Sequence, residues 1–94
     1  MTFKLVFHED AESEWRKLDK TITEQFKSKL KERLENPRVP SARVSGGANL
    51  YKIKLRTVGY RLVYQVNDAE ILILVLSVGK RERNAAYQSA FSRM

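Results

Sequence analysis

The spacing of the apolar residues changes from four to two along this chain, and that change limits the folds open to it. Ile22, Phe26, Leu30 and Leu34 recur at every fourth residue, which predicts the buried face of one helix. Residues 50–56 instead alternate apolar and basic side chains, which predicts a strand with one buried face. A chain that places helices first and alternating strands later is typical of an α+β domain.

Shorter signals complete the order of elements. Residues 2–7 alternate and predict a first strand, and a short helix begins at about residue 9. The sequence of residues 21–24 matches a capping box that begins the longer helix, and Asn36-Pro37 ends it. The predicted buried stripe of the short helix is Ala11, Trp15 and Leu18.

The second half of the chain predicts a meander and a closing helix. The pattern indicates strands at residues 50–56, 60–66 and 71–78, with turns at 57–59 and 67–70. Gly79 ends the last strand, and a helix from about residue 83 places Tyr87, Phe91 and Met94 on one stripe. We therefore expect one α+β domain over residues 1–94: an N-terminal strand and two helices, a three-stranded antiparallel meander and a C-terminal helix.

Composition excludes several classes of protein. With no cysteine, the chain has no disulfide scaffold, thiolate zinc site or cysteine nucleophile. Its longest apolar run, residues 71–78, is far below the roughly 18 residues that span a bilayer, and its start lacks the apolar stretch of a signal peptide. We expect a cytoplasmic protein with no membrane partner, and no metal or cofactor.

The basic residues are unevenly balanced by acids. The net charge is +7, and residues 48–94 hold eight of the 18 basic residues but only three of the 11 acidic ones. No acid occurs between Glu35 and Asp68. Such a basic half usually meets a polyanion, although charge that serves solubility alone is the alternative.

Strand register predicts where the cations gather. Pairing Leu55 with Tyr60 across a four-residue turn keeps one apolar face intact and sets Lys54 opposite Arg61, with Lys52 one pleat away. Like charges opposed across strands are destabilising, so stability alone does not explain this arrangement.

The second hairpin extends the group. Pairing Val66 with Ile71 sets Arg61 opposite Leu76, so the chain runs on past the same sheet end. The residues that arrive there are Lys80 and Arg81. We expect these cations to converge on the sheet face opposite the helices; the alternative is a solvated sheet face.

A cluster of this kind binds phosphate and could cleave RNA. Attack of a ribose 2′-hydroxyl on the adjacent phosphate adds negative charge to the phosphoryl oxygens, which fixed cations stabilise. The single histidine, His8, has no histidine to pair with, and we expect a structural or surface role for it. Crowding by like charges lowers the pKa of a lysine, which could make Lys52 or Lys54 a weak base. Tyr87 could stack on a base or belong to the core.

Four segments of the sequence resemble the RelE toxins of bacterial toxin–antitoxin pairs, and the likeness covers nearly the whole length. They are residues 14–18 (EWRKL), 51–56 (YKIKLR), 59–66 (GYRLVYQV) and 77–83 (SVGKRER). The resemblance implies a microbial-RNase-like fold and an mRNA endonuclease that cuts the codon in the ribosomal A site and leaves a 2′,3′-cyclic phosphate. It also implies a RelB-type antitoxin that neutralises the toxin, with a complex that binds operator DNA and represses the operon.

The same resemblance assigns roles to residues. Lys54 corresponds to the base, Arg81 to the acid at the leaving group, and Lys52 and Arg61 to contacts with the transition-state phosphate. Tyr87 corresponds to the residue that stacks on a substrate base. The implied catalytic set is Lys52, Lys54, Arg61, Arg81 and Tyr87; the implied contacts to RNA or the ribosome are Arg43, Ser45, Arg56, Lys80 and Arg83.

One position departs from the family pattern. Relatives carry a basic residue where this chain has Ser45, and whether Arg43 replaces it stays open. Two alternatives to the nuclease also stay open: a gyrase-inhibiting toxin of the related ParE branch, and an RNA-binding module without catalysis.

Overall fold

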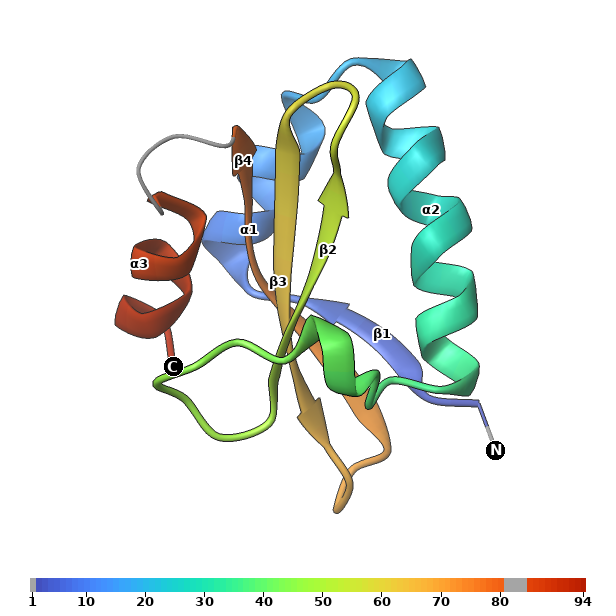
Figure 1. Cartoon of the computed structure of the whole chain (residues 1–94), viewed down its shortest axis with the longest axis vertical. Helices are drawn as coiled ribbons and strands as arrows, with labels where there is room; N and C mark the ends of the chain where they lie inside the picture. The colour runs from blue at the N-terminus through green and yellow to red at the C-terminus, as the bar shows by residue number, and fades with distance from the viewer. Residues whose placement is uncertain (1, 81–84) are drawn as a thin grey trace.

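A computed structural model of the chain describes residues 2–80 and 85–94, with the backbone alone at residue 85. The described elements are β1 (Lys4–Phe7), α1 (Glu9–Arg16), α2 (Lys20–Glu35), the 3₁₀ turn η1 (Pro40–Ala42), β2 (Leu50–Leu55), β3 (Tyr60–Asn67), β4 (Leu72–Lys80) and α3 (Ala85–Ser92). Figure 1 shows the strands crossing the middle of the molecule, with α2 on one side and α3 on the other. The predicted α+β class and order of elements are confirmed.

The described strands form one sheet in the order β1-β4-β3-β2. The meander is antiparallel, as predicted. The position of β1, which the alternation of residues 2–7 leaves open, is next to β4 and parallel to it, with Lys4 paired to Leu72. This order makes β2 an edge strand. Within the described residues, no helix is both long and apolar enough to cross a membrane.

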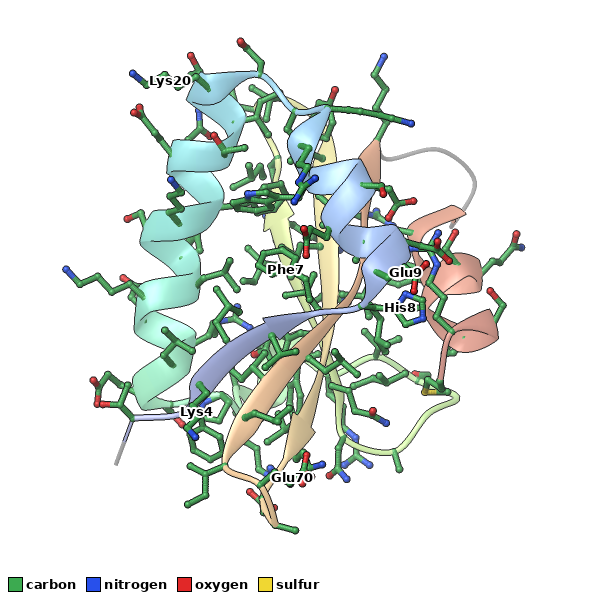
Figure 2. The ribbon with its side chains drawn as sticks, turned by 180° about the vertical axis from the view of Figure 1, so that it is seen from behind. Lys4, Phe7, His8, Glu9, Lys20 and Glu70 are labelled. Atoms are coloured by element: carbon green, nitrogen blue, oxygen red, sulfur yellow. The ribbon has the colours of Figure 1, made fainter. Side chains whose placement is uncertain are left out.

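The main core lies between the sheet and the first two helices. In Figure 2, Phe7 lies between α1 and α2, and its ring centroid is 5.2 Å from that of Trp15. Trp15 in turn lies 6.0 Å from Phe26, which is fully buried on the predicted stripe of α2. α2 ends at Glu35, before the predicted stop, but its N-cap is Asp19 rather than Thr21. The capping-box prediction is wrong because the Asp19 carboxylate already accepts the Lys20 N–H.

A second core lies on the opposite face of the sheet, under α3. Among the described side chains of this helix, Ala86 and Ala90 are buried, whereas Phe91 and the following Met94 are exposed. The predicted stripe of Tyr87, Phe91 and Met94 is therefore not the face through which the helix is buried: small residues let the helix approach the sheet closely, and the Ser77 hydroxyl donates to the Ala86 carbonyl at 2.6 Å. The cation-bearing face is accordingly shared with a helix, whereas we expected it to lie opposite all helices.

The two hairpins differ in how well register could be predicted. β2 and β3 pair as predicted, with Leu55 opposite Tyr60. β3 and β4 do not: Val66 pairs with Ile73, and Arg61 pairs with Gly79 instead of Leu76. Ile71 belongs to the turn, with a left-handed φ of 55°, and β4 carries a bulge opposite the Val63/Tyr64 step. These two features move the pairing along β4.

Tyr64 ties the end of α2 to the sheet. Its side chain is fully buried; its hydroxyl donates to the Pro37 carbonyl at 2.6 Å and accepts from Arg33 Nη1 at 2.9 Å. Burial raises the pKa of the Tyr64 phenol above its usual value, although the hydrogen bond from Arg33 opposes the shift. The neutral phenol is therefore part of the folded state.

We expect Tyr64→Phe to lower the free energy of unfolding by about 1–3 kcal/mol at neutral pH, because the buried Pro37 carbonyl loses its donor. Since the folded pKa is raised, the Tyr64 contribution is constant below about pH 10 and is lost above it, where only the unfolded phenol ionises. Urea unfolding of both proteins at pH 8 and at pH 10.5 measures the difference. A stability gap that widens at high pH would contradict this sign.

Candidate functional site

Three basic side chains share the face of the sheet on which α3 packs. Lys54 pairs directly with Arg61 across β2 and β3, as the sequence predicts. Lys52 lies two residues before Lys54 on the same face, because side chains alternate along a strand. The pairing brings three basic side chains together, and like charges stand directly opposite each other at Lys54 and Arg61.

Tyr87 joins this group from α3. The Arg61 guanidinium carbon lies 5.1 Å from the centre of the Tyr87 ring, within the range of a cation–π contact. Arg61 Nε is buried and has no hydrogen-bond partner among the described residues. Gly79 is opposite Arg61 and adds no side chain over it. The ring also packs partly against the second core, so the structural role that the sequence left open for Tyr87 is present, whereas stacking on a base stays a prediction.

A pocket of about 390 Å³ opens beside Tyr87, and we call it the Tyr87 pocket. Its lining residues are Arg43, Val44, Ser45, Lys52, Tyr87, Gln88 and Phe91. It unites two residues of the predicted catalytic set with Arg43 and Ser45, which the sequence placed among the contacts to RNA or the ribosome. Arg43 therefore supplies a basic side chain to the pocket in which Ser45 lies.

A second hollow of about 230 Å³ is also lined by Lys52, and we call it the Arg33 hollow. Its lining residues are Arg33, Ser41, Ala42, Lys52, Lys54 and Arg56. Arg56, a predicted RNA contact, lies here rather than in the Tyr87 pocket. Sequence patterns do not single out Arg33 or Ser41, since a charged residue on a helix and a serine in a loop are common on any surface.

One predicted residue, Lys80, is not brought into this group. Lys80 pairs with Tyr60, whose ring packs on the main core, so Lys80 occupies the face opposite to that of Arg61. The expectation that Lys80 joins the cluster is wrong, because the bulge in β4 reverses the alternation after Leu76. Arg81 and Arg83 lie outside the described residues.

An ion pair fixes α3 next to the site, and sequence reasoning missed it. Arg93 donates to both carboxylate oxygens of Glu14, at 2.8 and 3.1 Å, and to the Leu76 carbonyl at 2.9 Å. Glu14 also accepts the Val78 N–H. This hydrogen-bonded carboxylate raises the pKa of Arg93, although burial opposes the shift. Glu14 thereby links α1, β4 and the end of the chain.

His8 takes the structural role expected of it. It is the N-cap of α1, and its Nδ1 accepts the Asp10 N–H at 3.1 Å. Figure 2 shows His8 and Glu9 on the side of the molecule where α3 packs, away from Phe7. Among the described residues, no group of three histidine, cysteine, aspartate or glutamate side chains could hold a metal ion.

The arrangement suits one kind of chemistry. Lysine and arginine side chains that meet at one place stabilise the negative charge that develops on a phosphoryl group during its displacement. An aromatic ring at the same place offers a stacking surface for a nucleobase. The site therefore has the components for binding a nucleic acid strand and acting on its phosphate.

Comparison with known proteins identifies the family of this chain. A family described as the ParE toxin of the type II toxin–antitoxin system parDE matches residues 5–85. The mRNA interferase toxin RelE of Escherichia coli K12 is 51% identical over 100% of this chain and 99% of its own. The structure of a double arginine mutant of E. coli RelE in the free state has a TM-score of 0.93 at 49% identity, over 100% of this chain and 99% of that one.

A further solved structure includes an antitoxin. The toxin in the intact E. coli RelBE toxin–antitoxin complex matches with a TM-score of 0.83 at 53% identity, covering 86% of this chain and 99% of that chain. Full-length identity of about one half, a matching family over most of the chain and the shared fold agree with one another. This chain therefore belongs to the RelE/ParE family of type II toxin–antitoxin toxins.

Proposed function

We propose that this protein is a ribosome-dependent mRNA endonuclease that cuts mRNA in the ribosomal A site and thereby inhibits translation. The observation that carries the proposal is the direct pairing of Lys54 with Arg61, with Tyr87 held against Arg61. The names of the relatives, mRNA interferase toxin RelE in E. coli and mRNA interferase RelE in Shigella flexneri, support it.

The reaction is proposed as a transesterification within the RNA. The 2′-oxygen bonds to the adjacent phosphorus, its proton passes to Lys54, and the bond from phosphorus to the 5′-oxygen breaks. Arg81 protonates that oxygen, so the products are a 2′,3′-cyclic phosphate and a 5′-hydroxyl. Lys52 and Arg61 stabilise the charge on the phosphoryl oxygens, which is larger in the transition state than in the substrate. Tyr87 stacks on a base and fixes the strand.

The dependence on the ribosome follows from the weakness of this set. Lysine is mostly charged at neutral pH, and the described chain has no histidine–glutamate pair at the site to act as base and acid. Much of the rate must then come from holding the 2′-hydroxyl in line with the leaving group. The proposed partner for this task is the ribosome, which presents the codon.

Control of the activity is proposed to come from a RelB-type antitoxin. The E. coli relative has been solved with its antitoxin RelB, both as the intact complex and with a RelB peptide. By this likeness, a RelB-type antitoxin neutralises the toxin and carries the complex to operator DNA to repress the operon.

Mapping of cut sites tests the proposal. Purified ribosomes translate a defined mRNA with and without the protein, and primer extension locates the new ends. We expect cuts within the A-site codon, upstream fragments that end in a cyclic phosphate, and far slower cleavage of the same mRNA without ribosomes. Equal rates on free and ribosome-bound mRNA would contradict the argument from the weak base.

The same samples separate the alternatives. The matching family is described as ParE, so gyrase is tested directly with a supercoiled plasmid. Damaged plasmid without mRNA cuts would favour a gyrase inhibitor and overturn the nuclease. Binding of RNA with neither product would favour a module without catalysis.

A further inference from the structure

The Arg33 hollow carries an unusual concentration of positive charge. Four of its six lining residues are basic, and no aspartate or glutamate of the described chain lines it. Confined like charges repel, and an anion that enters such a hollow relieves this repulsion. The remaining lining residues, Ser41 and Ala42, are small and leave space for a ligand.

Arg33 is fixed in position before any ligand arrives. Its Nη1 donates to the Lys52 carbonyl at 3.1 Å and to the Tyr64 hydroxyl at 2.9 Å, and the guanidinium lies 5.8 Å from the Tyr64 ring centre. Both acceptors are neutral groups. Among the described residues, no carboxylate oxygen lies within 4.0 Å of the Arg33 nitrogens. This partly buried cation is thus held rigidly without a counter-charge, and a rigid guanidinium binds phosphate with little loss of entropy.

Lys52 connects the hollow to the proposed reaction site. It lines both the Arg33 hollow and the Tyr87 pocket, so the two spaces share one residue. Consider an RNA strand with one base against Tyr87 and its scissile phosphate near Lys52. From there the RNA continues either toward the Arg33 hollow or away from it. The charges favour the hollow, because the next phosphate of the strand then meets Arg33 and Arg56.

We propose that the Arg33 hollow is a second phosphate subsite, which binds a phosphodiester of the substrate strand next to the one that is cut. The inference rests on the proposed function, because that function identifies the bound strand as mRNA. It adds Arg33 as a residue that fixes the register of the RNA, with Arg56 and Lys52 as its partners.

Equilibrium binding tests the subsite without cleavage. The probe is a fluorescein-labelled RNA hexanucleotide with 2′-O-methyl groups, which cannot be cut, and anisotropy gives Kd over a range of KCl concentrations. Loss of one phosphate contact lowers the slope of log Kd against log salt by about 0.7. We expect this loss in Arg33→Gln and in Arg56→Gln, and no change in Lys29→Gln, an exposed charge of the same helix.

Arg33→Gln could affect folding, because Arg33 also donates a hydrogen bond to Tyr64. Arg56→Gln controls for this, because Arg56 is exposed. Slopes equal to that of the unmodified protein in both variants overturn the subsite, whether or not the protein cuts mRNA. Cleavage that fails on ribosomes while the slopes change as expected would overturn the nuclease and leave the phosphate subsite standing.

An uncharged internucleotide linkage in the mRNA tests whether the phosphate in the Arg33 hollow belongs to the strand that is cut. In the ribosome assay, a methylphosphonate placed next to the cut linkage should slow cleavage by the unmodified protein about tenfold, the effect of losing one charged hydrogen bond. Arg33→Gln should be slow on normal mRNA and lose nothing further on the neutral linkage. An equal slowing in both proteins would show that the hollow holds another phosphate, for instance of ribosomal RNA, and would overturn the same-strand assignment.

Discussion

Replacing Arg61 with glutamine should lower the rate of mRNA cleavage on ribosomes about 100- to 1000-fold, the usual effect of removing one fixed donor to a developing oxyanion. Arg61 faces Lys54 across the strands and contacts the Tyr87 ring, and its buried Nε has no partner among the described residues. An arginine presents a planar fork of N–H donors that matches phosphoryl oxygens, and the described residues leave the Arg61 Nε donor without a partner. Single-turnover cleavage, followed by primer extension, measures the loss.

The control for this prediction removes the same charge elsewhere. Arg16→Gln alters an arginine that is exposed and paired with Glu12 within α1, so cleavage should stay within about twofold. Arg61→Lys keeps the charge but not the planar fork, and should recover only part of the rate. Because Arg61 opposes Lys54, its removal relieves repulsion, and we expect the glutamine variant to unfold at an equal or higher urea concentration. A variant that loses activity together with stability would contradict the assignment of Arg61 to the site.

The pairing of Lys54 with Arg61 could be predicted because β2 and β3 each have one polar face. Alternation along both strands allowed only registers that keep the apolar side chains together, and a short turn selected one of them. β4 offered no such constraint. Its central residues are apolar on both faces, since the main core and α3 each cover one side, so nothing in the sequence marked the bulge or the left-handed Ile71. The misplacement of Lys80 followed directly from this.

Contacts between residues far apart in the sequence could not be predicted from local sequence patterns. Arg33 lies on a helix whose other charged residues face solvent, and only the end of β2 makes it part of a hollow. In the same way, Glu14 and Arg93 are 79 positions apart, and each is an ordinary residue in its own segment. The alanines Ala86 and Ala90, through which α3 packs on the sheet, carry no signal of their own in the sequence. The pairing of Lys54 with Arg61 could thus be predicted, whereas the contacts that hold the surrounding elements in place could not.

Replacing Arg93 with methionine should lower the free energy of unfolding by about 2–3 kcal/mol, the range for charged hydrogen bonds lost at a partly buried site. The Arg93 and Glu14 side chains are 17% and 32% exposed, so solvent screens this pair less than a surface pair. The change leaves the Leu76 carbonyl and the Glu14 carboxylate each without this donor. Urea unfolding measures the loss, and Arg16→Met provides the matched surface control, expected below about 0.5 kcal/mol.

The same ion pair should affect catalysis, because α3 carries Tyr87 into contact with Arg61. Arg93→Met is expected to weaken cleavage through the loss of Tyr87 positioning, and Arg93→Lys to restore it in part. Exchange of the charges in Glu14→Arg with Arg93→Glu should not restore stability. The backbone around the pair is itself polar: the Val78 N–H would point at an arginine and the Leu76 carbonyl at a carboxylate. An exchanged pair as stable as the unmodified protein would mean that charge alone, and not this set of backbone hydrogen bonds, holds α3 against the sheet.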